Sequence, residues 1–266
     1  MSEYKDTFKS TAQYYVKYRN RYPEALFTHL RNRFFLMQKD SVLDLGCGPG
    51  LLAIPLSRYA GRVIGMDPEP EMLEAAKEEA SAHEAKSIIW LSGKSDDIPE
   101  LPDEYRHFKL VTMGRSFHWM NGEQTLQDIA GILTDDGGVA IIWDSSSWRN
   151  WGSPEQEPVK EVITNYLGEH RRAGSGYYYP RKERFEDIVR NSCLRNMETW
   201  KTTWQQTVTV DEIVGYYFST SMANPSVLDD SKEAFENDLR ETLFRINPSG
   251  ITSSDVTTEA ILAWKR

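Results

Sequence analysis

The segment Val42–Leu52, with the sequence VLDLGCGPGLL, limits the possible folds of this chain more than any other segment does. Its apolar start belongs to a predicted buried strand at 41–45, and residues 51–59 follow a helical period. The glycines between them allow a tight turn and let a ligand approach main-chain N–H groups that a Cβ would block. This strand, loop and helix predict an α/β fold, although the same turn also occurs in α/β proteins without a ligand there.

The residues around this segment alternate between strand and helix patterns up to residue 144. Strand after helix after strand indicates right-handed crossovers and a mostly parallel sheet with helices on both faces. The predicted strands in this part are 41–45, 62–66, 88–91, 109–113 and 138–143, and the predicted helices are 23–35, 51–59, 71–82 and 122–133. Beyond it, we expect helices at 159–172, 211–220 and 232–244 and strands at 198–210 and 259–264.

The spacing of the glycines distinguishes between two kinds of cofactor. A nicotinamide-binding loop has the pattern G-x-G-x-x-G/A, which would place Leu51 where the third small residue belongs. This chain instead has G-x-G-x-G, at Gly46, Gly48 and Gly50. Asp44 precedes the loop, where its carboxylate can accept a hydrogen bond from a cationic amino group or orient the loop amides. Both features favour a cofactor that carries an amino acid over one that carries a pyrophosphate.

Acidic residues follow the second and third predicted strands. Asp67 ends the second strand in VIGMDPEPEML, where a carboxylate can accept hydrogen bonds from both hydroxyls of a ribose and reject a 2′-phosphate. The alternative is that Asp67 caps the next helix, but Pro68 intervenes. Ser95 and Asp96 follow the third strand in SGKSDDIP, where an acid can accept a hydrogen bond from an adenine amino group or lie in a solvated turn.

The fourth strand leads into GRSFHWM, residues 114–120. Strand ends face the ligand crevice of an open α/β sheet, so Arg115, Ser116, His118 and Trp119 are candidates to contact the cofactor or an acceptor. The pKa of an unperturbed histidine near 6.5 would let His118 accept a proton from an amine or hydroxyl. The alternative for this aromatic run is ordinary packing.

Together these motifs resemble the class I S-adenosylmethionine-dependent methyltransferases, and within them a small-molecule branch that includes trans-aconitate methyltransferase-like proteins. The segment AQYYVKYRNRYP at 12–23 is similar to the entry segment Y-x-x-Y-R-P-x-Y-P of that branch, with Asn20 where the branch has proline. The resemblance covers roughly residues 12–143. It implies a Rossmann-like, seven-stranded, mostly parallel sheet whose C-terminal strand runs antiparallel near the edge, with a helical and aromatic insertion.

The resemblance also implies roles for individual residues, with S-adenosyl-L-methionine as cofactor and S-adenosyl-L-homocysteine as product. The glycines would line the methionine portion, Asp67 would hold the ribose, and Ser95 and Asp96 would neighbour the adenine. Tyr15 and Arg19 would close over the cofactor. The predicted cofactor-binding set is Tyr15, Arg19, Asp44, Gly46, Cys47, Gly48, Gly50, Asp67, Pro68, Met72, Ser95, Asp96, Ser116 and Phe117.

We expect one methyltransferase domain over residues 1–266. Its predicted parts are an N-terminal helical cap (1–40), a cofactor-binding core (41–144), an acceptor-side insertion (145–197) and C-terminal strands and helices that complete the sheet (198–266). The insertion would select the acceptor through an aromatic wall and through arginines that pair with an acidic group. The alternative is that these aromatic residues pack on the core. The candidates in the insertion are Trp148, Trp151, Tyr177, Tyr178, Tyr179, Arg171, Arg172 and Arg181, and Arg115, His118 and Trp119 complete the acceptor-binding set.

Composition limits the partners. A net charge of −9 gives no general attraction to nucleic acid, and no apolar run is long enough for a membrane span. The two cysteines, Cys47 and Cys193, form no metal or disulfide pattern. We therefore expect a cytoplasmic monomer or homodimer, without a metal, that methylates oxygen or nitrogen of a small molecule. Methylation of RNA or protein, a non-catalytic cofactor-binding protein and, more distantly, a dehydrogenase are the alternatives.

Overall fold

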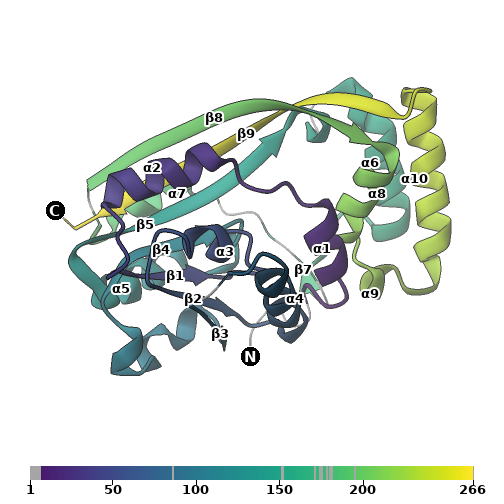
Figure 1. Ribbon diagram of the computed structural model, residues 1–266. Helices are drawn as coiled ribbons and strands as arrows, with labels where there is room; N and C mark the ends of the chain where they lie inside the picture. Colours follow the sequence, from purple (N-terminus) through teal and green to yellow (C-terminus); the bar gives the residue numbers. More distant parts are fainter. Residues whose placement is uncertain are drawn as a thin grey trace. The chain divides into compact units, whose positions relative to one another are not determined.

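The computed structural model describes residues 7–85, 87–150, 153–170, 172–173, 176–177, 179, 182–194 and 196–265 (Figure 1). The chain divides into two compact units. One, here called the helical unit, consists of Met1–Asn20, Ser145–Tyr179 and Thr203–Thr257. The other, here called the sheet unit, consists of Arg21–Asp144, Pro180–Thr202 and Thr258–Arg266. The division into the four functional parts given above stays a prediction.

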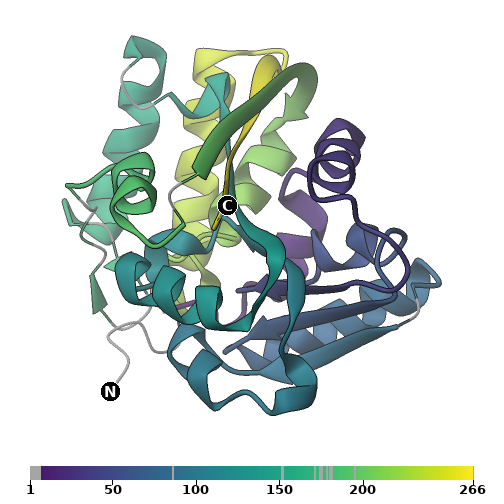
Figure 2. The same cartoon turned by 90° about the vertical axis from the view of Figure 1, so that its left-hand side faces the viewer.

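A seven-stranded sheet has the strand order β3-β2-β1-β4-β5-β9-β8. β1 pairs in parallel with β2 and β4, β2 with β3, and β4 with β5, and these strands lie side by side in two views (Figures 1 and 2). The C-terminal strand is antiparallel, which confirms the predicted Rossmann-like fold class. The strands are β1 (Ser41–Leu45), β2 (Arg62–Asp67), β3 (Ile88–Ser92), β4 (Phe108–Gly114), β5 (Leu133–Ser146), β8 (Asn196–Thr209) and β9 (Ile251–Trp264).

Helices account for most of the remaining described residues. Those of the sheet unit are α2 (Glu24–Phe34), α3 (Ala53–Leu56), α4 (Pro70–Ala82), α5 (Gly122–Ile132) and α7 (Phe185–Asn191), with the 3₁₀ turns η1 (Ser95–Glu100), η2 (Asp103–Tyr105) and η3 (Phe117–Trp119). Those of the helical unit are α1 (Ala12–Tyr18), α6 (Glu157–Leu167), α8 (Val210–Phe218), α9 (Pro225–Leu228) and α10 (Lys232–Ile246), with η4 (Ser147–Arg149), η5 (Pro154–Gln156) and η6 (Asp229–Ser231). Two short strands, β6 (Arg172–Ala173) and β7 (Gly176–Tyr177), pair with each other in antiparallel orientation. Among the described residues, no helix is long and apolar enough to cross a membrane.

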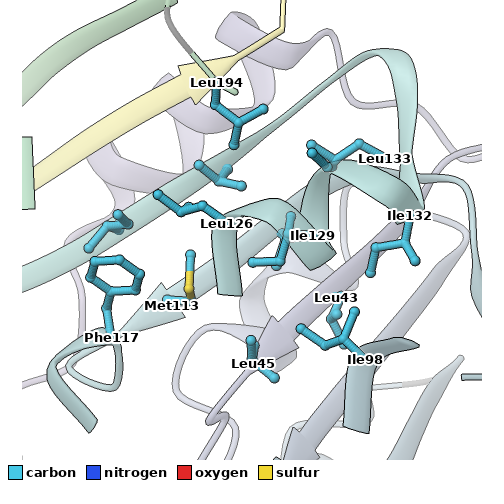
Figure 3. Packing of buried hydrophobic residues seen from close by; sticks show 14 of the residues in the cluster. Leu43, Leu45, Ile98, Met113, Phe117, Leu126, Ile129, Ile132, Leu133 and Leu194 are labelled. Atoms are coloured by element: carbon cyan, nitrogen blue, oxygen red, sulfur yellow. The ribbon is translucent and has the colours of Figure 1, made fainter. Parts of the chain in front are cut away.

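The core of the sheet unit holds the ends of the central strands in place. Leu43 and Leu45 of β1 and Met113 of β4 belong to one buried cluster with Leu126 and Ile129 of α5 (Figure 3). Each fully buried side chain of this size stabilises the fold by about 1.5–3 kcal/mol. Because this cluster fixes β1 and β4, the loops that follow both strands start from a rigid base.

The helical unit has its own core around α8 and α10. Tyr217 and Phe218 of α8 pack with Phe235 and Leu239 of α10 in a second buried cluster. Gly215 allows α1 to approach α8, since a Cβ at this position would lie 2.3 Å from the Tyr18 ring.

Several predicted elements differ in length from the observed ones, among them β5, which spans Leu133–Ser146 rather than 138–143, and α6, which spans Glu157–Leu167 rather than 159–172. The helix predicted at 51–59 is helical only at Ala53–Leu56, and tighter i to i+3 bonds follow it, with Tyr59 N donating to Leu56 O at 2.9 Å. The last strand begins at Ile251 rather than at residue 259. Its added half buries Ser254 and Thr258, and buried hydroxyl residues give no apolar signal in the sequence.

Candidate functional site

The glycine loop after β1 has a backbone that requires its glycines. Gly46, Gly48 and Gly50 have φ values of 69°, 52° and 82°, in the left-handed region that side chains disfavour. A Cβ on Gly46 would lie 2.5 Å from the Cβ of Ser116, and one on Gly50 would lie 2.8 Å from the Trp90 ring. Among the described residues, a Cβ on Gly48 would meet no neighbouring atom within 4 Å. Gly48 therefore borders open space where a ligand can approach the backbone.

Asp44, in β1 just before this loop, is buried and has two hydrogen-bond donors. Its Oδ1 accepts a hydrogen bond from Thr112 Oγ1 at 2.8 Å, and its Oδ2 accepts one from Ala53 N at 3.1 Å. Burial raises the pKa of Asp44 to about 7, although both hydrogen bonds favour the charged form. These bonds join Asp44 to β4 and to the first residue of α3, and both roles considered for Asp44 stay predictions.

Asp67 ends β2 beside the glycine loop. Its Oδ2 accepts a hydrogen bond from Gly48 N at 2.8 Å, and its Oδ1 accepts one from Glu69 N at 2.9 Å. Burial raises the pKa of this carboxyl to about 6, against the opposing effect of the two N–H donors. Each carboxylate oxygen has a second lone pair, so two hydroxyl groups can still donate to it.

The loop and Asp67 fit the nucleoside and amino-acid parts of S-adenosylmethionine. The space beside Gly48 is one that a Cβ would fill, and Asp67 is held by the same residue's N–H. A carboxylate fixed in this way can accept hydrogen bonds from both ribose hydroxyls. The neighbouring candidates differ in exposure, because Pro68 is exposed while Cys47 and Met72 are buried.

Ser95 and Asp96 lie in η1, at the same edge of the sheet. The edge is continuous there because Gly93 N donates to the main-chain oxygen of Asp67 at 3.2 Å. Ser95 is buried, whereas Asp96 is exposed and forms an ion pair with Lys94 at 2.6 Å. That ion pair lowers the pKa of Asp96, so this carboxylate is an acceptor at neutral pH.

Of the two residues after Arg115, Ser116 contacts the glycine loop and Phe117 packs in the core. Ser116 Oγ donates to Leu45 O at 2.8 Å and contacts the glycine loop, while the Phe117 ring packs edge-on against Phe185 at 5.2 Å. Phe117 is fully buried in the core, so only its backbone remains as a candidate for cofactor contact.

Arg115 has a backbone φ of 56° and a buried guanidinium group. It forms an ion pair with Asp144 and stacks 4.5 Å from the centre of the Tyr22 ring. These contacts tie the end of β4 to β5. They favour a positioning role for Arg115.

His118 and Trp119 form the rest of η3. Their rings lie 4.8 Å apart at 43°, and both side chains are half-buried. This half-buried position is compatible with both roles considered for His118, contact with an acceptor and packing against Trp119.

Tyr15 and Arg19 belong to the helical unit. Arg19 lies 4.8 Å from the Tyr15 ring and 4.4 Å from the Tyr216 ring, and its Nε donates to Ser219 Oγ at 2.7 Å. Arg149 stacks on Tyr216 as well, at 4.7 Å. The two arginines line a cavity of about 120 Å³ together with Lys17 and Glu212, so its cationic side chains outnumber the single carboxylate. This cavity is suited to an anionic group.

The aromatic candidates of the insertion have different surroundings. Trp148 is buried edge-on against Tyr216 at 5.2 Å and Tyr217 at 6.3 Å. Tyr177 and Tyr179 are 44% and 66% exposed. Trp151, Tyr178, Arg171 and Arg181 lie outside the described residues, as does the side chain of Arg172.

Sequence reasoning missed three residues that shape the site. Thr112 holds Asp44, Trp90 covers Gly50, and Asp144 pairs with Arg115. Thr112 had a detectable signal, because it is a polar residue within an apolar strand and pairs in register with Asp44, the polar residue of the adjacent strand. The other two depend on contacts that strand pattern alone does not reveal.

A mostly parallel sheet with this strand order, a glycine loop after β1 and a buried acid at the end of β2 are the arrangement expected of a class I methyltransferase. Residues 42–137 match a family model described as a methyltransferase domain. The chain contains a methyltransferase domain, and the comparisons support an S-adenosylmethionine-dependent methyltransferase of class I.

Individual relatives agree with this class. The Saccharomyces cerevisiae protein named "Probable S-adenosylmethionine-dependent methyltransferase CRG1" is 24% identical over 261 residues, covering 86% of each chain. The ubiquinone biosynthesis O-methyltransferase of Bradyrhizobium diazoefficiens is 33% identical over 112 residues, covering 42% of each. The crystal structure of YcgJ from Bacillus subtilis has a TM-score of 0.55 at 17% identity, covering 92% of this chain and 99% of its own, and shows likeness of fold.

Proposed function

We propose that this enzyme methylates an oxygen or nitrogen atom of a small molecule, with a metabolite carboxylate, hydroxyl or amine as acceptor. S-Adenosylmethionine is the methyl donor. The observation that supports the site most strongly is the Asp67 carboxylate, fixed by the N–H groups of Gly48 and Glu69 beside an open glycine loop. The small-molecule acceptor is favoured by the net charge of −9 and by the ubiquinone biosynthesis relative.

The residues of the sheet unit would bind and orient the cofactor. Asp67 would accept hydrogen bonds from the ribose hydroxyls, and Ser95 and Asp96 would neighbour the adenine. Asp44 and Ser116 would keep the glycine loop in its binding conformation through their bonds to Ala53 N and Leu45 O. When bound, the cofactor supplies an electrophilic methyl group on a sulfonium centre.

His118 would act according to the acceptor. A hydroxyl or protonated amine must lose a proton, and a neutral imidazole can accept it. A carboxylate or free amine needs no base, and orientation then supplies much of the rate, since effective molarities of ~10⁵ to 10⁸ M are reached in oriented reactions. Trp119, Trp148, Tyr177, Tyr178 and Tyr179 are the proposed acceptor-binding residues, with Arg115 holding the strand end.

Transfer of a labelled methyl group tests the acceptor class. The protein is incubated with methyl-tritiated S-adenosylmethionine and a cell extract divided by ultrafiltration into small molecules and macromolecules. We expect label to enter the small-molecule fraction and the Asp67→Ala variant to transfer little. Label in RNA or protein alone would overturn the small-molecule proposal, and binding without transfer to either fraction would indicate a non-catalytic protein.

A further inference from the structure

The helical unit contains a second, larger cavity of about 280 Å³. Residues of η4, α6, α8 and α10 and the first residues of β9 line it. Its wall is formed mainly by large apolar and aromatic side chains, namely Trp148, Val159, Ile213, Tyr217, Leu243 and Ile246. Ligand pockets are typically concave and lined mainly by apolar and aromatic side chains with a few polar groups, so this partly open cavity is a candidate ligand site.

The cavity differs in charge from the neighbouring cationic one. None of the described residues lining it is Asp, Glu, Lys, Arg or His. Trp148 lines both cavities, so the indole contributes to an uncharged wall in one and to a cationic wall in the other. A charged ligand group would lose its hydration in the larger cavity without gaining a partner of opposite charge. The lining therefore selects for an uncharged ligand.

Neutral polar groups accompany the apolar wall. Hydroxyl and amide groups in the lining come from Ser147, Ser153, Gln156, Asn247, Thr252 and Ser253. The Tyr217 phenol is also there, and burial raises its pKa above the ordinary value, so it remains neutral. Such groups can orient a ligand that has one or two hydroxyl or carbonyl oxygens.

Apolar surface continues outward from the lining. Ile246, which lines the cavity, is 38% exposed, and Ile251, next to the lining residues Gly250 and Thr252, is 54% exposed. Phe244 is 46% exposed and covers Gly250, where a Cβ would lie 2.7 Å from its ring. Clustered apolar exposure of this kind is typical of a binding surface.

We propose that this cavity binds an uncharged, mainly apolar small molecule of about two fused rings. A cavity of roughly 150 Å³ accommodates benzene, and this one is nearly twice that size. The site lies wholly within the helical unit and requires no cofactor. Trp148 is also one of the proposed acceptor-binding residues, so the two proposals share this residue, but binding without cofactor tests the cavity separately from methyl transfer.

A pair of ligands with the same rings and different charge tests the proposal. 2-Naphthol is neutral at pH 7 and 2-naphthoate is anionic, and each is titrated calorimetrically into the full-length protein without cofactor. We expect 2-naphthol to bind on the order of tenfold or more tightly than 2-naphthoate, because the anion lacks a partner in the cavity. No binding of 2-naphthol, or equal binding of both, would overturn the proposal.

Three variants locate the binding. Ile213→Trp fills the interior of the cavity, and Ser253→Trp adds bulk at an exposed lining position. Thr207→Trp adds the same side chain at an exposed position of the cationic cavity and serves as the control. We expect both cavity variants to lose 2-naphthol binding while the control keeps it. If Ile213→Trp does not fold, as judged by circular dichroism, Ser253→Trp decides. Retained binding in the folded cavity variants would overturn the assignment.

Discussion

Cofactor binding is expected to weaken at mildly acidic pH because Asp67 takes up a proton. The pKa of this carboxyl is raised to about 6 by burial, so it is almost fully charged at pH 8. At pH 5.5 only about a quarter of the molecules have the charged form. The charged form accepts hydrogen bonds from ribose hydroxyls more strongly, by about 1 kcal/mol for each of two bonds, or about 30-fold in all.

Calorimetric titration with S-adenosylhomocysteine measures this effect. The dissociation constant should rise roughly fourfold between pH 8 and pH 5.5, and the Asp67→Asn variant should bind more weakly without this dependence. Asp44 also titrates, with a pKa of about 7, and the Asn variant separates the two groups because it leaves Asp44 in place. An affinity independent of pH in the natural protein, or the same dependence in Asp67→Asn, would refute the reasoning.

Three further predictions concern the loop and its support. Gly48→Ala should bind S-adenosylhomocysteine at least tenfold more weakly, because the added methyl group enters the open space beside the loop. The left-handed backbone at this position adds a stability cost of about 1 kcal/mol. The control is Gly131→Ala, whose Cβ also meets no described atom within 4 Å and which should keep full affinity in the same titration. The folded-state pKa of Asp44 lies above its unfolded value, so Asp44 should lower the free energy of unfolding in urea by about 2–3 kcal/mol between pH 5 and pH 8, in addition to a smaller fall from Asp67. Asp44→Asn should remove the larger part of this fall, and an unchanged fall would contradict the raised pKa of Asp44. Arg115→Met should lower the free energy of unfolding by about 3 kcal/mol, because Asp144 is left buried without its ion-pair partner. The double variant Arg115→Met, Asp144→Leu should recover part of this lost stability. A loss below about 1 kcal/mol in Arg115→Met would contradict a stabilising role of the pair.

The sequence was most informative where apolar residues and glycines coincide. The bounds of β1 and the left-handed glycines follow from the run SVLDLGCGPG, because only a buried strand and a constrained loop suit that pattern. The antiparallel C-terminal strand followed from family resemblance, and the sheet order confirms it. The long first half of β9 was missed, since its buried side chains include Ser254 and Thr258, which look like loop residues in a sequence.

The sequence predicted which residues belong to the candidate site, but it did not predict the contacts between them. Asp44 was selected because it precedes the loop, but its partners, Thr112 of β4 and Ala53 of α3, could not be read from the sequence. Phe117 was proposed for the cofactor, whereas its ring packs in the core, because a 3₁₀ turn directs neighbouring side chains to different sides. The acceptor remains a proposal because aromatic residues serve packing and binding equally well.

The most direct test of the central claim is calorimetric titration of the purified protein with S-adenosylmethionine and S-adenosylhomocysteine, with NAD as control and Asp67→Ala alongside. We predict that both methionine nucleosides bind, that NAD does not, and that the variant loses tenfold or more in affinity because two hydrogen bonds to a charged group are removed. Binding of NAD alone, or binding of the methionine nucleosides that is unchanged in Asp67→Ala, would contradict the assignment of Asp67 and the glycine loop as the cofactor site.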